Sequence, residues 1–324
     1  MFNTLDPLLV SVLAAYSFIL VAAIMLGGKL PSLIRMTHTR TQLVMSFVSG
    51  LMLGIAIFHL LPHAIYTIAS DQAVDIAARW TMLGLLVMFL LLRVFHFHHH
   101  DMSDDAHETQ CVEHAGEDHA HDHTLHPENS SSTKPVSWMG IALGLTIHTM
   151  IDGVALAASM QADWSLLSGN QGLTVLVGLG VFLAILLHKP LDALTISSLM
   201  SDSGASKAKQ RLVMFGFAII CPLSAFAALW GINFISGGNG LYVGAALAFS
   251  AGVFLCISLS DLLPEVHFHS HDRFKMTVVL LLGVGLALAL VTVEPAHRHS
   301  DSNVVIEVKE QSNSYHHHHS QCEH

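Results

Sequence analysis

Charged residues are scarce in this 324-residue chain and make up 12% of it, where an ordinary soluble domain carries about 25%. Because 52% of the residues are hydrophobic, this composition excludes a soluble cytosolic enzyme. Basic residues are fewest, since 14 Lys and Arg face 24 Asp and Glu and leave a formal net charge of −10. That charge excludes electrostatic binding of nucleic acid and favours cations as partners.

Cysteine is also rare, and the sequence has no CxxC pair. The four cysteines lie far apart: Cys111, Cys221, Cys256 and Cys322. This spacing excludes a disulfide framework and a thiolate zinc finger. The first apolar stretch lacks the basic leader and the small-residue cleavage site of a signal peptide, so we expect it to be a retained span.

Long apolar stretches are what the chain has instead. A bilayer core about 30 Å thick needs about 20 mostly apolar residues per helix. Reading outward from each apolar run to the nearest charge or turn gives eight stretches: 8–26, 43–65, 79–95, 136–160, 172–200, 211–235, 241–264 and 276–293. We therefore predict an all-α polytopic protein of the lipid bilayer with eight transmembrane helices.

The spans divide the chain into four parts. We expect transmembrane helices 1–3 within 1–95, a polar loop at 96–135, helices 4–8 within 136–293 and a tail at 294–324. Ten of the 14 basic residues lie in or next to the loops after spans one, three, five and seven. Because short cytoplasmic loops collect Lys and Arg, this bias predicts that both termini are extracytoplasmic. The membrane is then the cell membrane, either a plasma membrane or a bacterial inner membrane.

Histidine is in excess, with 25 residues. Ten of them lie in the polar loop, interleaved with Asp and Glu: His96, His98, His99, His100, His107, His114, His119, His121, His123 and His126. Low apolar content predicts disorder there until something binds, and mixed imidazoles and carboxylates suit zinc, copper or nickel. The alternative is a solvated loop with no required role, and the histidines of the tail leave the same choice.

Ionisable residues inside two spans carry the main functional signal, because such residues are expensive in a membrane. His148 and Asp152 are spaced i, i+4 in the fourth span, and His188 and Asp192 repeat that spacing in the fifth. This spacing places each pair on one helix face. LTIHTMIDGVALAASM and ILLHKPLDALTISSLM match at an offset of 40 residues, so the two spans resemble copies.

The two pairs predict one site for a divalent transition metal at the bilayer midplane, built from two imidazoles and two carboxylates. Pro190 agrees with this because a proline in a span is tolerated where the helix lines a cavity. A single buried histidine would more simply be a core residue that is hydrogen-bonded to a neighbouring helix. Two matching HxxxD pairs favour the metal site.

A second internal copy lies at an offset of 202 residues. SGLMLGIAIFHLLPH (49–63) overlays AGVFLCISLSDLLPE (251–265), so that Gly50 aligns with Gly252. The two spans run in opposite directions through the membrane, which predicts inverted repeats in a 3+2+3 arrangement. Inverted repeats are typical of transporters that alternate access around a midplane site.

The same overlay predicts a pathway entrance and a pathway exit. His59 and His63 fall near the outer end of the second span, and Asp261 and Glu265 near the inner end of the seventh, followed by His267. These residues would relay metal into and out of the central site. The alternative is that they merely cap helices at a proline-bearing boundary.

These motifs together resemble the Zrt/Irt-like (ZIP) family of divalent metal transporters. HTMIDG (148–153) is similar to the family's fourth-span motif, HKPLDA (188–193) to its fifth-span motif, and AGVFLCISLSDLLPE to its seventh-span signature. The resemblance implies uptake of zinc, and in some members iron, manganese or cadmium, toward the cytoplasm by a rocking or elevator motion. It implies no enzymatic activity and no cofactor, and it leaves a homodimer open.

Two positions depart from members with a two-metal centre. Such members have Asn after the first histidine and often Glu after the second, whereas this chain has Thr149 and Lys189. The resemblance therefore implies a one-metal site. Lys189 would supply the positive charge that a second cation otherwise provides, because a buried carboxylate pair needs a counter-charge.

Two other functions were compared with metal uptake. A cation-diffusion exporter also uses HxxxD pairs and a histidine-rich loop, but it resembles six spans followed by a folded cytoplasmic domain. A membrane di-iron oxygenase needs clustered HxxxH and HxxHH boxes, and those histidines would have to come from the low-complexity loop. Both alternatives fit the sequence less well than metal uptake does.

Overall fold

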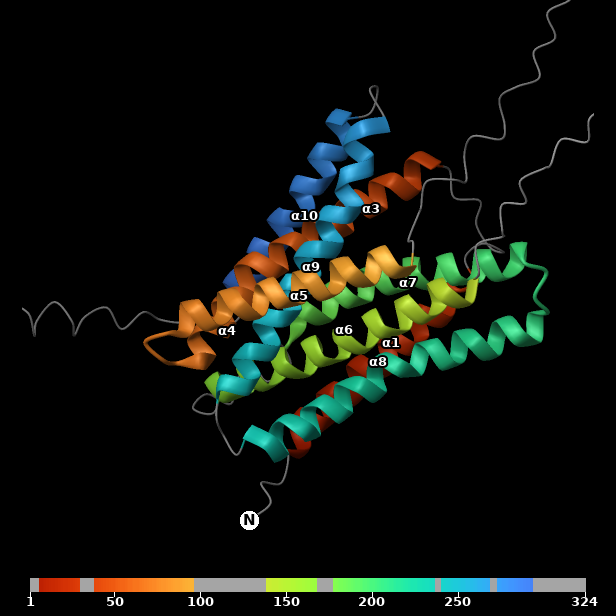
Figure 1. Cartoon of the computed structure of the whole chain (residues 1–324). Helices are drawn as coiled ribbons and strands as arrows, with labels where there is room; N and C mark the ends of the chain where they lie inside the picture. The colour runs from red at the N-terminus through yellow and green to blue at the C-terminus, as the bar shows by residue number, and fades with distance from the viewer. Residues whose placement is uncertain are drawn as a thin grey trace, which may run out of the picture.

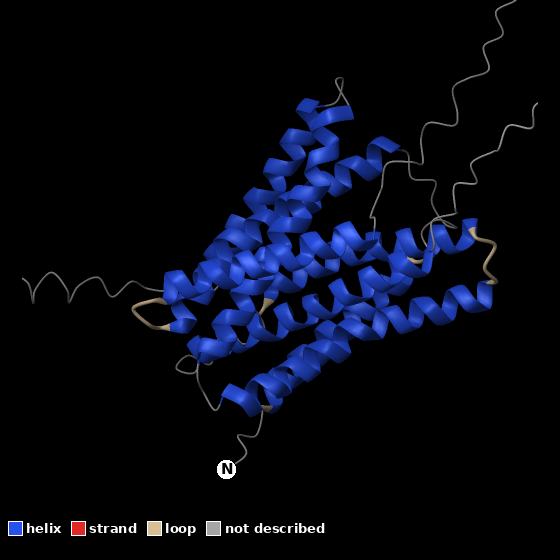
Figure 2. Cartoon of the chain, in the orientation of Figure 1, coloured by secondary structure: helices blue, strands red, loops and turns tan. Residues whose placement is uncertain are grey.

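Helices make up the regular structure of the computed structural model, which describes residues 6–29, 38–95, 138–167, 177–236, 240–268 and 273–293. No strand occurs within these ranges, and short turns at 69–72 and 203–206 are the described connections between helices (Figures 1 and 2). The elements are α1 (Pro7–Gly27), α3 (His38–Ile55), the π-helical turn η1 (Ala56–Leu60), α4 (Leu61–Ile68), α5 (Ala73–Phe95), α6 (Trp138–Leu167), α7 (Leu179–Asp202), α8 (Lys207–Ser236), α9 (Gly240–Phe268) and α10 (Arg273–Val293).

Eight of the described helical segments are long and apolar enough to cross a membrane, with α3, η1 and α4 forming one continuous segment. Large apolar side chains cover their outward faces, among them Phe18, Phe234 and Phe274, which are 76%, 71% and 82% exposed. A soluble monomer rarely exposes so much contiguous apolar surface. The prediction of an all-α polytopic membrane protein with eight spans is confirmed.

Several helices extend beyond the apolar stretches that predicted them. α5 begins at Ala73 and not at 79, and α6 ends at Leu167 and not at 160. The apolar stretch stops at the first charged or polar residues, but the backbone hydrogen bonds of the helix continue through them. The extra turns of α6 matter because they include Asp163.

The predicted fifth span, 172–200, is by contrast not one continuous helix. Within the described residues α7 begins at Leu179, directly after Gly178, whose φ is 69°. This left-handed conformation suits glycine and does not continue a right-handed helix. The Gly178 amide donates a hydrogen bond to Asp163 Oδ2 at 2.7 Å, so the start of α7 is fixed to the end of α6.

The helices pack as two bundles. The first bundle consists of α3, η1, α4, α5, α9 and α10, in which α3 packs along α10 and α5 packs along α9. The second bundle consists of α1, α6, α7 and α8, in which α6 packs along α8 and α1 contacts both α7 and α8. The bundles meet mainly where α9 contacts α6 and α3 contacts α7 (Figure 1).

Glycines allow two close helix contacts in the first bundle. Each glycine lies so near a backbone carbonyl oxygen of the facing helix that a Cβ would overlap it, and the contacts are reciprocal. They join Gly50 to Leu280 and Gly283 to Phe47 between α3 and α10, and Gly252 to Thr81 and Gly84 to Phe249 between α9 and α5. Small residues allow such close helix packing inside a membrane, where dispersion contacts drive association.

Candidate metal site

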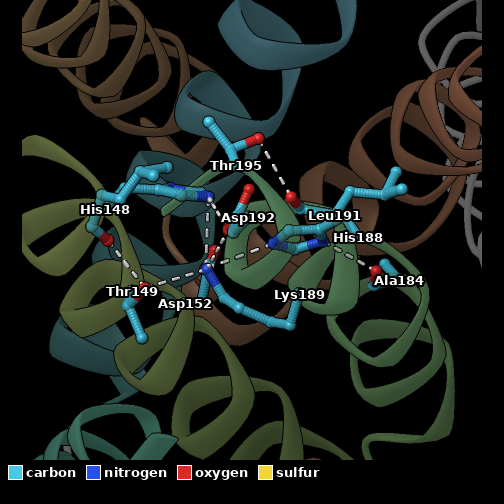
Figure 3. Close-up of polar contacts among 10 residues, drawn as sticks. His148, Thr149, Asp152, Ala184, His188, Lys189, Leu191, Asp192 and Thr195 are labelled. Atoms are coloured by element: carbon cyan, nitrogen blue, oxygen red, sulfur yellow. Dashed lines mark hydrogen bonds and ion pairs between the residues drawn. The ribbon is translucent and has the colours of Figure 1, made fainter. Parts of the chain in front are cut away.

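The four ionisable residues of the central motifs come together between α6 and α7. His148 and Asp152 lie one turn apart near the middle of α6, and His188 and Asp192 do the same on α7. Figure 3 shows the four side chains pointing toward one another. His148, Asp152 and His188 are buried, and Asp192 is partly exposed.

The spacing of the donor atoms suits a single metal ion. His148, His188 and Asp192 each present a ligand atom, and these three atoms lie within 4.8 Å of one another. Oδ2 of Asp152 is close to both rings, at 3.3 Å from His148 Nε2 and 3.4 Å from His188 Nε2. Imidazole nitrogens and carboxylate oxygens in one small cluster are a donor set for zinc and related divalent metals.

A hydrogen bond orients the His188 ring for this arrangement. Nδ1 of His188 lies 2.8 Å from the Ala184 carbonyl oxygen, and since a carbonyl can only accept, Nδ1 carries the hydrogen. In a neutral ring Nε2 then keeps its lone pair, and it faces Asp152. A metal-binding histidine commonly donates such a hydrogen bond from its other ring nitrogen, and this bond fixes the orientation of the ring.

Two atoms of the cluster are buried without a hydrogen-bond partner among the described residues. They are Nδ1 of His148 and Oδ1 of Asp152. Buried polar atoms are normally paired, and an unpaired carboxylate oxygen and an unpaired imidazole nitrogen in one site point to a ligand that both could bind.

Lys189 lies inside the cluster, although lysine is a costly residue to bury. Its Nζ is 2.5 Å from Asp152 Oδ2 and 2.9 Å from Asp192 Oδ2, and it donates to Thr149 Oγ1 at 3.0 Å. The side chain is fully buried. With neutral imidazoles, two carboxylates and one ammonium give the cluster a formal charge of −1.

A second cluster forms near the C-terminal end of α6. His59 of η1 and His63 of α4 meet Asp163, and the three residues present ligand atoms within 4.8 Å of one another. Both histidines were predicted from the sequence but Asp163 was not, because the fourth span was predicted to end at 160. The signal was available, since Asp163 follows Asp152 by 11 residues, which is about three helical turns and the same helix face.

The structure leaves the remaining predicted residues without described side chains. Asp261, Glu265 and His267 lie in the last turns of α9, where the backbone is described and the side chains fall outside the described part. The histidine-rich loop at 96–135 and the tail at 294–324 also lie outside the described residues.

Comparison with known proteins gives a consistent result. Residues 8–291 match the family described as ZIP Zinc transporter. "Zinc transporter ZIP9" of Xenopus tropicalis is 25% identical over 279 residues, covering 74% of this chain and 80% of that protein. "Zinc transporter ZIP9" of Micropogonias undulatus is 32% identical over 160 residues, covering 48% of this chain and 47% of that protein.

A third relative carries a broader description. "Metal cation symporter ZIP8" of Homo sapiens is 31% identical over 133 residues, which cover 41% of this chain and 25% of that protein. The aligned parts thus span from a quarter to four-fifths of these relatives. The family match extends over nearly all of the described helices, and it favours this family over the cation-diffusion family and over an oxygenase. The chain belongs to the ZIP zinc transporter family.

Proposed function

We propose that the chain is a transmembrane transporter that carries divalent transition-metal ions, foremost zinc, toward the cytoplasm. The observation that carries the proposal is the meeting of two imidazoles and two carboxylates between α6 and α7 in a bundle of transmembrane helices. Membership of a zinc transporter family supports zinc as the cargo. Iron, manganese and cadmium are the other ions that this donor set would accept.

The central site holds one ion at a time in this proposal. An ammonium and a second cation about 4 Å apart would repel each other by about 4 kcal/mol per unit charge at an effective dielectric of 20. Lys189 Nζ already contacts both carboxylates, so a second divalent ion would compete with the ammonium for the same oxygens. It would also be repelled by both the ammonium and the first ion. The lysine takes the place of that ion.

Alternating access is the proposed mechanism, and the helix contacts support the inverted repeat behind it. If spans one to three repeat as spans six to eight, the contact of α3 with α10 corresponds to that of α9 with α5. Both contacts exist, and both are built on reciprocal glycines. Gly50 and Gly252, which align in the sequence overlay, occupy equivalent places in the two contacts.

Movement of one bundle past the other would open the central site to each side in turn. All four central residues belong to α6 and α7, both in the second bundle, so the site would travel as one unit. His59 and His63 serve as the pathway entrance, and Asp261, Glu265 and His267 as the exit. The bias of basic residues supports extracytoplasmic termini in the cell membrane, and a homodimer is compatible with this mechanism.

Uptake of radioactive zinc into liposomes that contain the purified protein tests the proposal. His148→Ala and Asp192→Asn should each abolish zinc uptake, because no nearby residue replaces the lost ligand. Asp202→Asn, which removes the same charge from an exposed position at the end of α7, is the matched control and should transport normally. Near-normal uptake by both site variants would refute the site, and competition by unlabelled iron, manganese and cadmium would rank the cargo.

A further inference from the structure

We propose that His59, His63 and Asp163 form a second binding site for a divalent transition metal, located where the two helix bundles meet. This site extends the entrance role of the two histidines to a complete three-ligand set. It rests on the proposed function only for the identity of the ion, because its donors and geometry are independent of the central site.

The three donors already face one another. Nδ1 of His63 lies 3.2 Å from Asp163 Oδ1, and the rings of His59 and His63 are 4.2 Å apart between centroids. All three side chains are buried, with exposed fractions of 1%, 8% and 5%. Two imidazoles and one carboxylate leave one position open in a tetrahedral zinc site, as in sites where the ion also binds an exchangeable ligand.

Both ends of the cluster are held in place by hydrogen bonds outside it. Nε2 of His59 lies 3.1 Å from Ser159 Oγ, which orients the first ring. Asp163 accepts a hydrogen bond from the Gly178 amide on Oδ2, so that Oδ1 turns toward His63. No hydrogen bond to Asp163 Oδ1 occurs within the described residues. The carboxylate thus has one oxygen fixed by the backbone and the other directed at an imidazole.

Local backbone geometry also marks this place. His59 lies in η1, a single π-helical turn between the α-helical stretches of the second span. Single π-helical turns are rare in proteins overall, but those that occur are often found at functional sites. The two histidines do not lie at a helix end, because α4 continues to Ile68 beyond them.

The two clusters lie on the same face of α6. His148 and Asp152 are followed 11 residues later by Ser159 and Asp163, a separation of about 16 Å along the helix axis. α6 therefore contributes to two proposed metal sites that are aligned along its length, one shared with α7 and one shared with η1 and α4.

The second site differs from the central site because it connects the two bundles. Its histidines belong to the first bundle and its carboxylate to the second. An ion bound there bridges the two bundles and must be released before they can move apart. In this proposal the second site binds an ion only in the conformation described here. The ion is released when the bundles move and the central site opens to the other side of the membrane.

Counting bound zinc on the purified full-length protein tests this site. Wild type and variants are equilibrated at one free zinc concentration, the folded fraction is separated by gel filtration, and zinc per chain is measured by elemental mass spectrometry. Asp163→Asn keeps an acceptor for the Gly178 amide and removes the anionic ligand. His59→Gln keeps a partner for Ser159 and provides a second variant, and Asp202→Asn is the control for loss of charge.

We expect Asp163→Asn and His59→Gln each to bind one zinc ion fewer than wild type and Asp202→Asn. The histidine-rich loop and tail are identical in all of these proteins, so they cancel in the difference. A wild-type zinc count in folded Asp163→Asn or His59→Gln would overturn the second site. Asp192→Asn separates the two proposals, since an unchanged count in that variant would refute the central site while leaving this one standing.

Discussion

Replacement of Lys189 by methionine is the sharpest test of a one-metal central site. Methionine has a similar length and no charge, so Lys189→Met removes the ammonium and leaves Asp152 and Asp192 facing each other. Lys189 is fully buried and lies within 3.0 Å of both carboxylates and of Thr149. The variant therefore has two buried carboxylates and no protein counter-charge.

Two opposite effects on stability follow, and both can be estimated. Removing one partner of a buried ion pair destabilises a protein by about 3–5 kcal/mol, so the zinc-free variant should be less stable than wild type. An ion about 2 Å from Asp192 Oδ2 would lie within about 5 Å of Nζ, where a divalent charge is repelled by about 7 kcal/mol at an effective dielectric of 20. Loss of that repulsion should make zinc bind more tightly to Lys189→Met.

Thermal unfolding with a chelator and with zinc measures both effects. We expect Lys189→Met to unfold at a lower temperature than wild type with the chelator and to gain more from zinc, because a ligand that binds only the folded state stabilises it more when it binds more tightly. Lys207→Met, which removes an exposed lysine, is the control and should behave as wild type. Equal midpoints for Lys189→Met and wild type in both conditions would show that the ammonium does not balance the carboxylates.

Three further variants test the charge at position 189, the histidine-rich loop and a glycine contact between helices. Lys189→Glu should admit a second ion to the central site, seen as one additional zinc per chain by elemental mass spectrometry, and an unchanged count would contradict the charge argument. Deleting 98–126 should leave zinc uptake into liposomes possible with an altered apparent affinity, because every ligand of the central site lies elsewhere; complete loss of uptake in a normally inserted protein would place the loop in the pathway. Gly252→Val should lower the unfolding midpoint, because its Cβ would overlap the Thr81 carbonyl oxygen, whereas Gly216→Val has open space around it and should have little effect.

Local sequence patterns determined the helices and the central motifs. A span requires about 20 apolar residues whatever its neighbours are, so composition alone predicted eight of them. An i, i+4 spacing places two side chains on one helix face in any α-helix, which is why His148 with Asp152 and His188 with Asp192 could be paired before the fold was known. The internal sequence copies also indicated that the fourth span resembles the fifth and that the second resembles the seventh.

Tertiary packing decided which faces meet and which residues join them. Asp163 becomes a partner of His63 only because α6 continues past its apolar stretch and lies beside α4, and neither the helix end nor the neighbour is encoded in a local repeat. Lys189 could be expected near two carboxylates, but the direction of its side chain depends on how α7 is rotated against α6. Helix ends and helix rotations are set by contacts between distant segments, so these details of both clusters required the folded structure.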